Sequence, residues 1–134
     1  YALRSVYSAG VDGIVLSPRN WLSAAGTVCR SSAGASELAD IATASGEDAA
    51  RLFRSAGFRI IGTDLNDSIS VYDANLHYPL LLIIGGEKRG ISRTLKAVTD
   101  EIVRLDYGRD FPEALSAASA AAILSFEVLR QNRY

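Results

Sequence analysis

The sequence predicts one α/β domain with a mainly parallel sheet flanked by helices. The chain has 134 residues, a length that suits a single compact domain. Hydrophobic residues make up 49% and charged residues 22%, which is ordinary for a soluble globular domain. Short strand-like apolar runs alternate with segments of helical spacing, and this alternation favours a parallel sheet.

The first half of the chain contains two predicted helices and one predicted strand before residue 58. A first helix is expected over Tyr1–Ala9, and Gly13–Pro18 is typical of a short buried strand closed by proline. Ser45 is a helix-capping residue type, and the acids after it favour the positive end of a helix dipole. Apolar residues then recur at helical spacing until Gly57, which predicts a helix between these points.

The second half contains three predicted strands, at 58–63, 80–84 and 101–105. Residues 80–84 are continuously apolar, as in a strand covered on both faces. A short helix is predicted at 92–97 and a long one at about Glu113–Arg133. Residues 64–79 are the least patterned, and we expect a lid or an irregular connection there.

Several function classes are disfavoured by composition. The formal net charge of −1 gives no global indication of nucleic-acid binding. The longest apolar run is far shorter than the ~20 residues of a membrane helix. One cysteine, Cys29, and one histidine, His77, argue against a disulfide framework and against a cysteine- or histidine-based metal site. Because the chain starts at Tyr1 rather than Met, we expect the native N-terminus to lie upstream.

The segment from Gly85 to Ser92 is the most informative loop. It follows a predicted buried strand, and ligands bind at the carboxyl ends of parallel strands. Glycines there let a ligand approach the backbone. Gly85 and Gly90 have the spacing of a phosphate-binding loop, but Ile91 stands where that loop needs lysine. A nucleotide-binding domain of that type is therefore disfavoured, while a tight turn and a ligand loop remain equally open.

Three further features have an ordinary interpretation beside a functional one. The strand exit at 105–111 is most simply a solvated Arg/Asp pair. Six alanines among residues 114–122 either admit a ligand or partner closely or reflect helix propensity alone. Arg4, on the predicted first helix, is of a type that is usually solvated or paired at a surface.

Taken in order, these segments resemble the SpoU-type (TrmH-like) RNA ribose 2′-O-methyltransferases of the SPOUT superfamily. The matching segments are Tyr1-Ala2-Leu3-Arg4, Gly10-Val11-Asp12-Gly13, Ser32-Ala33-Gly34-Ala35, Leu82 to Gly90, Leu105-Asp106-Tyr107-Gly108, Ala114-Leu115-Ser116 and Phe126 to Gln131. Some positions depart from the family pattern. Ser116 stands for an asparagine, Ala114 and Ala118 stand for serines, and Asp106 and Tyr107 stand for a Pro-Met pair.

The resemblance implies an α/β fold with a C-terminal trefoil knot that works as a homodimer in the cytoplasm. Residues 1–134 would be the catalytic domain, with an N-terminal strand and an RNA-binding domain upstream. S-adenosylmethionine would be the cofactor, bent within the knotted loops. The residues expected to line it are Thr63, Ile84, Gly85, Gly86, Leu105, Tyr107, Gly108, Ala114, Leu115 and Ser116.

The implied activity is methyl transfer to the ribose 2′-hydroxyl of rRNA or tRNA, without a metal and without a membrane. Arg4 matches the catalytic arginine of the family, and Glu87 would fix Arg4 or shape the loop. Since arginine stays protonated in proteins, we expect Arg4 to stabilise the developing alkoxide, and a role as proton acceptor stays open. The expected RNA contacts are Arg4, Lys88, Arg89 and Arg93, away from the acids Glu37, Asp40, Glu47 and Asp48.

The departures from the family pattern leave a second hypothesis open. A divergent SPOUT-like dimer with the serine at 116 and the alanine at 118 would bind RNA or cofactor but transfer nothing. Methylation assays separate this binding module from the enzyme.

Overall fold

A parallel four-stranded sheet forms the centre of the computed structural model, which describes residues 2–18, 30, 33–85 and 90–133. Its strand order is β4-β6-β3-β5. The strands are β3 (Arg59–Thr63), β4 (Ile69–Ser70), β5 (Leu80–Leu82) and β6 (Glu101–Arg104). A separate parallel pair joins β1 (Gly13–Leu16) to β2 (Asp40–Thr43). The predicted α/β class with parallel strands is confirmed.

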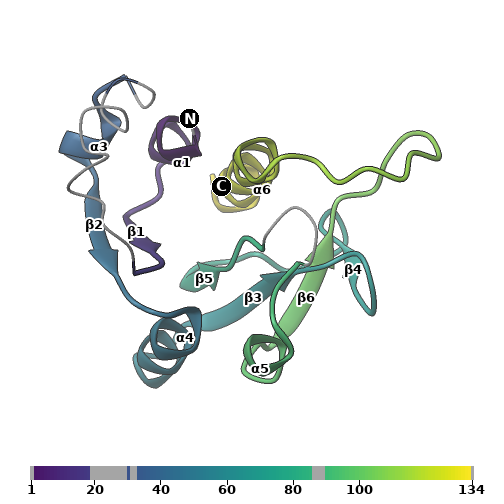
Figure 1. Ribbon diagram of the computed structural model, residues 1–134, viewed down its shortest axis with the longest axis horizontal. Helices are drawn as coiled ribbons and strands as arrows, with labels where there is room; N and C mark the ends of the chain where they lie inside the picture. Colours follow the sequence, from purple (N-terminus) through teal and green to yellow (C-terminus); the bar gives the residue numbers. More distant parts are fainter. Residues whose placement is uncertain (1, 19–29, 31–32, 86–89, 134) are drawn as a thin grey trace.

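Helices cover both sides of the four-stranded sheet. Figure 1 shows α6, with α1 beside it, on one side and α4 and α5 on the other. The helices are α1 (Ala2–Ser8), α3 (Ala35–Leu38), α4 (Gly46–Ser55), α5 (Arg93–Lys96) and α6 (Ala117–Asn132). Ser45 caps α4 as predicted, since its hydroxyl accepts a hydrogen bond from Asp48 N at 3.1 Å.

Alternation along the strands divides the apolar side chains between two cores. Ile61 belongs to the core under α6, and its neighbour Ile60 belongs to the core under α4 and α5. Along β5 and the residues after it, Leu80 and Leu82 pack on the first core, and Leu81 and Ile83 on the second. Because successive side chains of a strand point to opposite faces, the 80–84 segment is covered on both sides, as predicted.

The structure differs from the expected elements at three places. Residues 64–79 are mostly an irregular connection, as one of the two expectations had it, but they also contain β4 and the fully buried Val71 and Leu76. The last helix begins at Ala117 rather than Glu113. The pair α3 and β2 was not predicted, and every residue of β2 is exposed, so its sequence carries no burial pattern.

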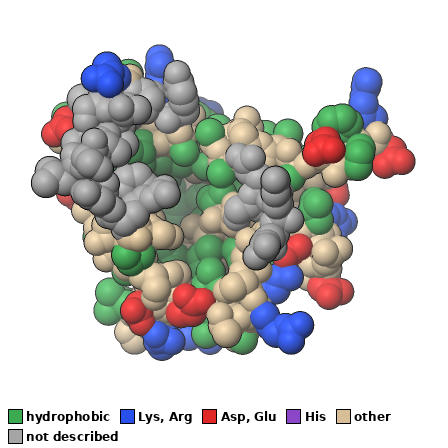
Figure 2. All heavy atoms as spheres, in the orientation of Figure 1, with side chains coloured by type: hydrophobic (Ala, Val, Ile, Leu, Met, Phe, Trp, Pro, Cys, Tyr) green, Lys and Arg blue, Asp and Glu red, His purple; other side chains and the backbone are tan. Residues whose placement is uncertain are grey.

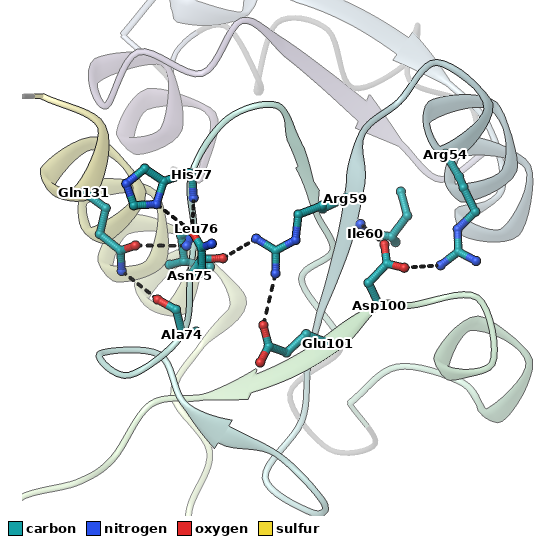
Figure 3. Close-up of polar contacts among 10 residues, drawn as sticks. All are labelled: Arg54, Arg59, Ile60, Ala74, Asn75, Leu76, His77, Asp100, Glu101 and Gln131. Atoms are coloured by element: carbon teal, nitrogen blue, oxygen red, sulfur yellow. Dashed lines mark hydrogen bonds and ion pairs between the residues drawn. The ribbon is translucent and has the colours of Figure 1, made fainter.

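Polar contacts fix the amino-terminal edge of the strands (Figure 3). Arg59 donates to the Asn75 carbonyl and, at 3.2 Å, to Glu101. Asp100 accepts from Ile60 N and from Arg54, both at 2.7 Å. These hydrogen bonds fix the starts of β3 and β6. The loops that follow β3, β5 and β6 lie at the opposite edge of the sheet.

The end of α6 is bound to the segment that precedes β5. Gln131 Oε1 accepts from Leu76 N at 2.9 Å, and its Nε2 donates to the Ala74 carbonyl at 3.1 Å (Figure 3). The Gln131 amide therefore both accepts from and donates to the backbone of residues 74–76. Asn132 Oδ1 also accepts a hydrogen bond from Tyr78 N at 3.0 Å.

Candidate functional site

The candidate site lies where the chain leaves the carboxyl ends of β3, β5 and β6. Thr63 ends β3, Ile84 and Gly85 follow β5, and Leu105 follows β6. These strands are parallel neighbours, so their exits share one edge of the sheet. This edge is the usual place for a ligand in such a sheet.

Thr63 joins two of these exits. Its hydroxyl donates to the Ile83 carbonyl at 3.0 Å and accepts from Gly85 N at 3.0 Å. The side chain is half-buried. The structure therefore brings the predicted residues Thr63, Ile84 and Gly85 together, and it gives the Thr63 hydroxyl a contact with the loop itself.

The two glycines of the loop after β5 touch each other. A Cβ atom on Gly85 would lie 2.5 Å from the carbonyl carbon of Gly90, so no side chain fits there. Gly90 has a φ of +63°, in the left-handed region that favours glycine. The two ends of the segment that has the spacing of a phosphate loop therefore meet at these glycines. This supports the interpretation as a tight turn, and the role as a ligand loop stays a prediction.

Asp64 was not among the predicted site residues, yet it is the most buried carboxylate near the loop. Its side chain is 9% exposed and pairs with Lys96 Nζ at 2.6 Å. Burial opposes the charge, but hydrogen bonds from Asn66 N and from Lys96 outweigh it and lower the pKa of Asp64 below its ordinary value. Asp64 and Lys96 are far apart in the sequence, and no local pattern connects them.

The loop after β6 is closed by a tyrosine. The Tyr107 hydroxyl donates to the Glu113 carbonyl at 3.0 Å and accepts from Leu115 N at 3.1 Å. The loop borders an open, shallow hollow of about 510 Å³ lined by Asp106, Tyr107, Gly108, Arg109, Phe111 and Leu115. Three of the predicted cofactor residues, Tyr107, Gly108 and Leu115, therefore share one concave surface.

This loop extends away from the body of the molecule. Figure 1 shows it between β6 and α6, and Figure 2 shows apolar side chains and charges of both signs on it. At its base, hydrogen bonds from the Ser70 hydroxyl and from Arg104 lower the pKa of Asp106. Asp106 and Tyr107, which depart from the Pro-Met pair of the resembled family, thus both form contacts that build the loop.

Ser116 caps α6. Its hydroxyl accepts from Ser119 N at 3.1 Å, and its backbone is extended, as in an N-cap residue. Ala114 and Leu115 precede the helix and are exposed, whereas Ala118 is half-buried within it. The serine keeps the capping function that an asparagine would provide, since the two residue types rank together as caps.

The structure does not bring all predicted basic residues together. Arg4 is exposed on α1, and Arg93 begins α5 on the other side of the sheet (Figure 1). Gly86, Glu87, Lys88 and Arg89 lie outside the described residues, as do Tyr1, Ser32 and Cys29.

Glu47, which was expected to lie away from the basic residues, lies beside the segment that contains Arg93. Glu47 Oε1 accepts from the Thr94 hydroxyl at 2.9 Å and from the Ser92 hydroxyl at 3.3 Å. Glu47 therefore lies next to the start of α5, where Arg93 is, and the expectation of separate acidic and basic regions is wrong at this point. The contact crosses from α4 to α5, and the sequence alone does not pair them.

No group of three or more His, Cys, Asp or Glu side chains among the described residues is placed to hold a metal ion. No helix in the described part of the chain is long and apolar enough to cross a membrane.

Comparison with known proteins connects this geometry to one family. The model of the SpoU rRNA Methylase family matches residues 1–126. An uncharacterized tRNA/rRNA methyltransferase of Mycobacterium ulcerans is 29% identical over 132 residues, which cover 98% of this chain and 42% of that protein. The chain thus spans less than half the length of this relative.

Solved structures have the same fold. The SpoU methyltransferase AviRb of Streptomyces viridochromogenes, in complex with AdoMet, matches with a TM-score of 0.82 and 27% identity, over 97% of this chain and 53% of that one. An RNA 2′-O ribose methyltransferase matches with a TM-score of 0.88 and 23% identity, over 97% and 50%. At that identity, the second likeness shows the fold alone.

Proposed function

Because the chain belongs to the SpoU rRNA methylase family, we propose that it is the catalytic domain of an S-adenosylmethionine-dependent methyltransferase acting on the ribose 2′-hydroxyl of rRNA or tRNA. The observation that carries the proposal is the joining of the loops after β3 and β5 by Thr63, at the edge of the sheet where β6 also ends. These are the loops in which the resemblance places the cofactor.

The residues of this edge fit such a cofactor. Gly85 and Gly90 keep side chains out of the turn, so backbone groups can face a ligand. Tyr107, Gly108 and Leu115 line the hollow at the loop after β6, which offers apolar surface to a ligand. S-adenosylmethionine carries both polar groups and an apolar adenine face, and a site of this kind holds both. Likeness to the AdoMet complex of AviRb supports the same assignment.

The cofactor supplies a methyl group that its sulfonium already activates, so the protein has to orient the ribose and assist the loss of its 2′-proton. We assign the second task to Arg4, whose guanidinium is exposed on α1. As a permanent cation it stabilises the negative charge that develops on the 2′-oxygen and can also hold a neighbouring phosphate. Glu87 remains a candidate for fixing Arg4 or shaping the loop.

We further propose that the protein acts as a homodimer and that its C-terminal part forms the trefoil knot of the family. Exposed apolar side chains on α1 and α6 support the dimer, namely Tyr7, Ile123 and Phe126. The knot is what the family resemblance implies, and the bonds of Gln131 to Ala74 and Leu76 place the end of α6 beside a segment distant in sequence. We also propose that a segment outside this chain binds RNA and that the protein works in the cytoplasm.

Transfer of a tritiated methyl group from S-adenosylmethionine to bulk rRNA or tRNA tests the function, with the full-length protein as catalyst. We expect incorporation that maps to a ribose 2′-oxygen by its resistance to alkaline cleavage. Label on a base, or none on either RNA, would contradict the proposal. Cofactor binding without transfer would instead favour the binding module, although the cap formed by Ser116 removes one reason for that alternative.

A further inference from the structure

Two consecutive residues at the end of β3 hold the two ends of the loop after β5. We propose that Thr63 and Asp64 are positioning residues, which hold Gly85 and Gly90 in place for the cofactor. This inference rests on the proposed cofactor site. It changes the expected role of Thr63, from lining the cofactor to holding the loop, and it adds Asp64, which was not among the expected site residues.

Thr63 holds the first end. Its hydroxyl has one hydrogen to donate, and the Ile83 carbonyl takes it at 3.0 Å. The same oxygen accepts from Gly85 N, so the backbone on both sides of Ile84 is tied to β3. With its only proton committed to the loop, Thr63 acts on a bound molecule through the position of Ile84 and Gly85.

Asp64 holds the second end. Its Oδ2 pairs with Lys96 Nζ at 2.6 Å, and its Oδ1 accepts from Asn66 N at 3.0 Å. The same Oδ2 would lie 2.9 Å from a Cβ atom on Gly90, so the carboxylate packs directly against the backbone of that glycine. Lys96 ends α5, which follows the loop, and the ion pair therefore fixes α5 to the end of β3.

The two ends meet at the glycines. Gly85 approaches Gly90 so closely that a Cβ atom would be 2.9 Å from the Gly90 Cα. The contact has no side chains of its own. Thr63 holds Gly85 by a hydrogen bond, and the Asp64 carboxylate, which Lys96 fixes, packs against Gly90. A loop fixed in advance binds its ligand more tightly, because less conformational freedom is lost on binding. Releasing either end should therefore weaken cofactor binding.

Calorimetry with S-adenosylmethionine and the full-length protein tests the inference. Thr63→Val keeps the shape and removes the hydroxyl, and we expect the Kd to rise about tenfold. Thr63→Ser keeps the hydroxyl and should restore binding to within about twofold of the unmodified protein. Asp64→Asn removes the charge that pairs with Lys96, and we expect a rise of about fivefold.

Two control variants match these changes elsewhere in the molecule. Ser55→Ala, on α4, also removes a hydroxyl that donates to a backbone carbonyl, that of Leu52 at 2.7 Å. Glu101→Gln also removes the acid of an ion pair, with Arg59, at the opposite edge of the sheet. Both should lower thermal stability about as much as Thr63→Val and Asp64→Asn while leaving the Kd unchanged.

Kinetics distinguish positioning from general damage. Thr63→Val should raise the KM for S-adenosylmethionine and leave kcat within about twofold, because a saturating concentration of the cofactor compensates for its weaker binding. Loss of kcat at unchanged KM would overturn the inference, and so would a Kd equal to that of the unmodified protein in both Thr63→Val and Asp64→Asn. Failure of the unmodified protein to bind S-adenosylmethionine would overturn the proposed function itself, together with this inference.

Discussion

Arg4 is the residue on which the proposed chemistry depends. Arg4→Ala should lower kcat for methyl transfer by about 100-fold or more, because a cation that stabilises the developing oxyanion is lost. The affinity for S-adenosylmethionine should change by less than about threefold, since the guanidinium acts on the RNA. Single-turnover transfer and calorimetry measure the two effects. Arg51→Ala, which removes another exposed arginine, is the control. Near-normal transfer by Arg4→Ala would remove Arg4 from the mechanism.

Glu127 should make stability depend on pH. Its side chain is 7% exposed, and hydrogen bonds from Arg130 and Gln131 lower its pKa from the ordinary 4.5, although burial acts in the opposite direction. A carboxyl whose pKa is lower in the folded state stabilises the fold above its unfolded pKa and loses this contribution as pH falls through the folded pKa.

The difference in unfolding free energy between the unmodified protein and Glu127→Gln should therefore be constant above about pH 5 and shrink below it. Urea titrations at a series of pH values measure this difference. A difference that does not vary between neutral and acid pH would show that the charge of Glu127 contributes nothing.

At the residue scale, the sequence predicted residue types better than contacts. Thr63, Tyr107 and Ser116 were all expected at the site, and each has a hydroxyl that builds a loop or a helix start there. The partners could not be predicted, because the pairing of Asp64 with Lys96 exists only after the sheet and α5 have packed.

At the element scale, the start of α6 depends on one hydroxyl. Ser116→Ala should destabilise the protein by about 1 kcal/mol, because Ser119 N–H loses its acceptor, and Ser116→Asn should be close to neutral. Thermal unfolding measures both. Ser119→Ala is a control that keeps the backbone bond to Ser116. Equal stability of Ser116→Ala and the unmodified protein would contradict the role of the cap.

Local sequence patterns did not predict the start of α6 or the short strand β4. Ala114 and Leu115 favour a helix, but Tyr107 holds Leu115 N–H in the loop, and the helix begins only after Ser116. The segment 64–79 lacked periodicity because its buried residues, such as Val71 and Leu76, are separated by turns. Strong patterns, as in 80–84 and 45–57, gave the correct elements.

At the scale of the whole molecule, the parallel sheet followed from alternating strands and helices, but its order did not. The neighbours β3 and β6 are separated in the chain by β4, β5 and α5, and only long-range packing brings them together. The near-neutral charge is likewise a property of the whole chain, and it leaves RNA binding to local groups or to segments outside this chain.

The proposed dimer is also a property of the whole molecule. Phe126 is 47% exposed on α6, whose opposite side packs on the core through Leu124 and Val128. Covering an exposed aromatic of this kind favours association by burying apolar surface. Phe126→Glu should therefore turn the dimer into a monomer at micromolar concentration, because a charge would have to be buried in its place.

Size-exclusion chromatography with light scattering measures the mass of the Phe126→Glu protein. Leu52→Glu is the matched control, because Leu52 is 67% exposed on α4, on the other side of the sheet. That variant should keep the dimer, and circular dichroism should show both variants folded. Dissociation by both would indicate a general loss of stability, and dissociation by neither would exclude the α6 face as the interface. If Phe126→Glu alone is monomeric, loss of methyl transfer with it would show that the site needs both subunits.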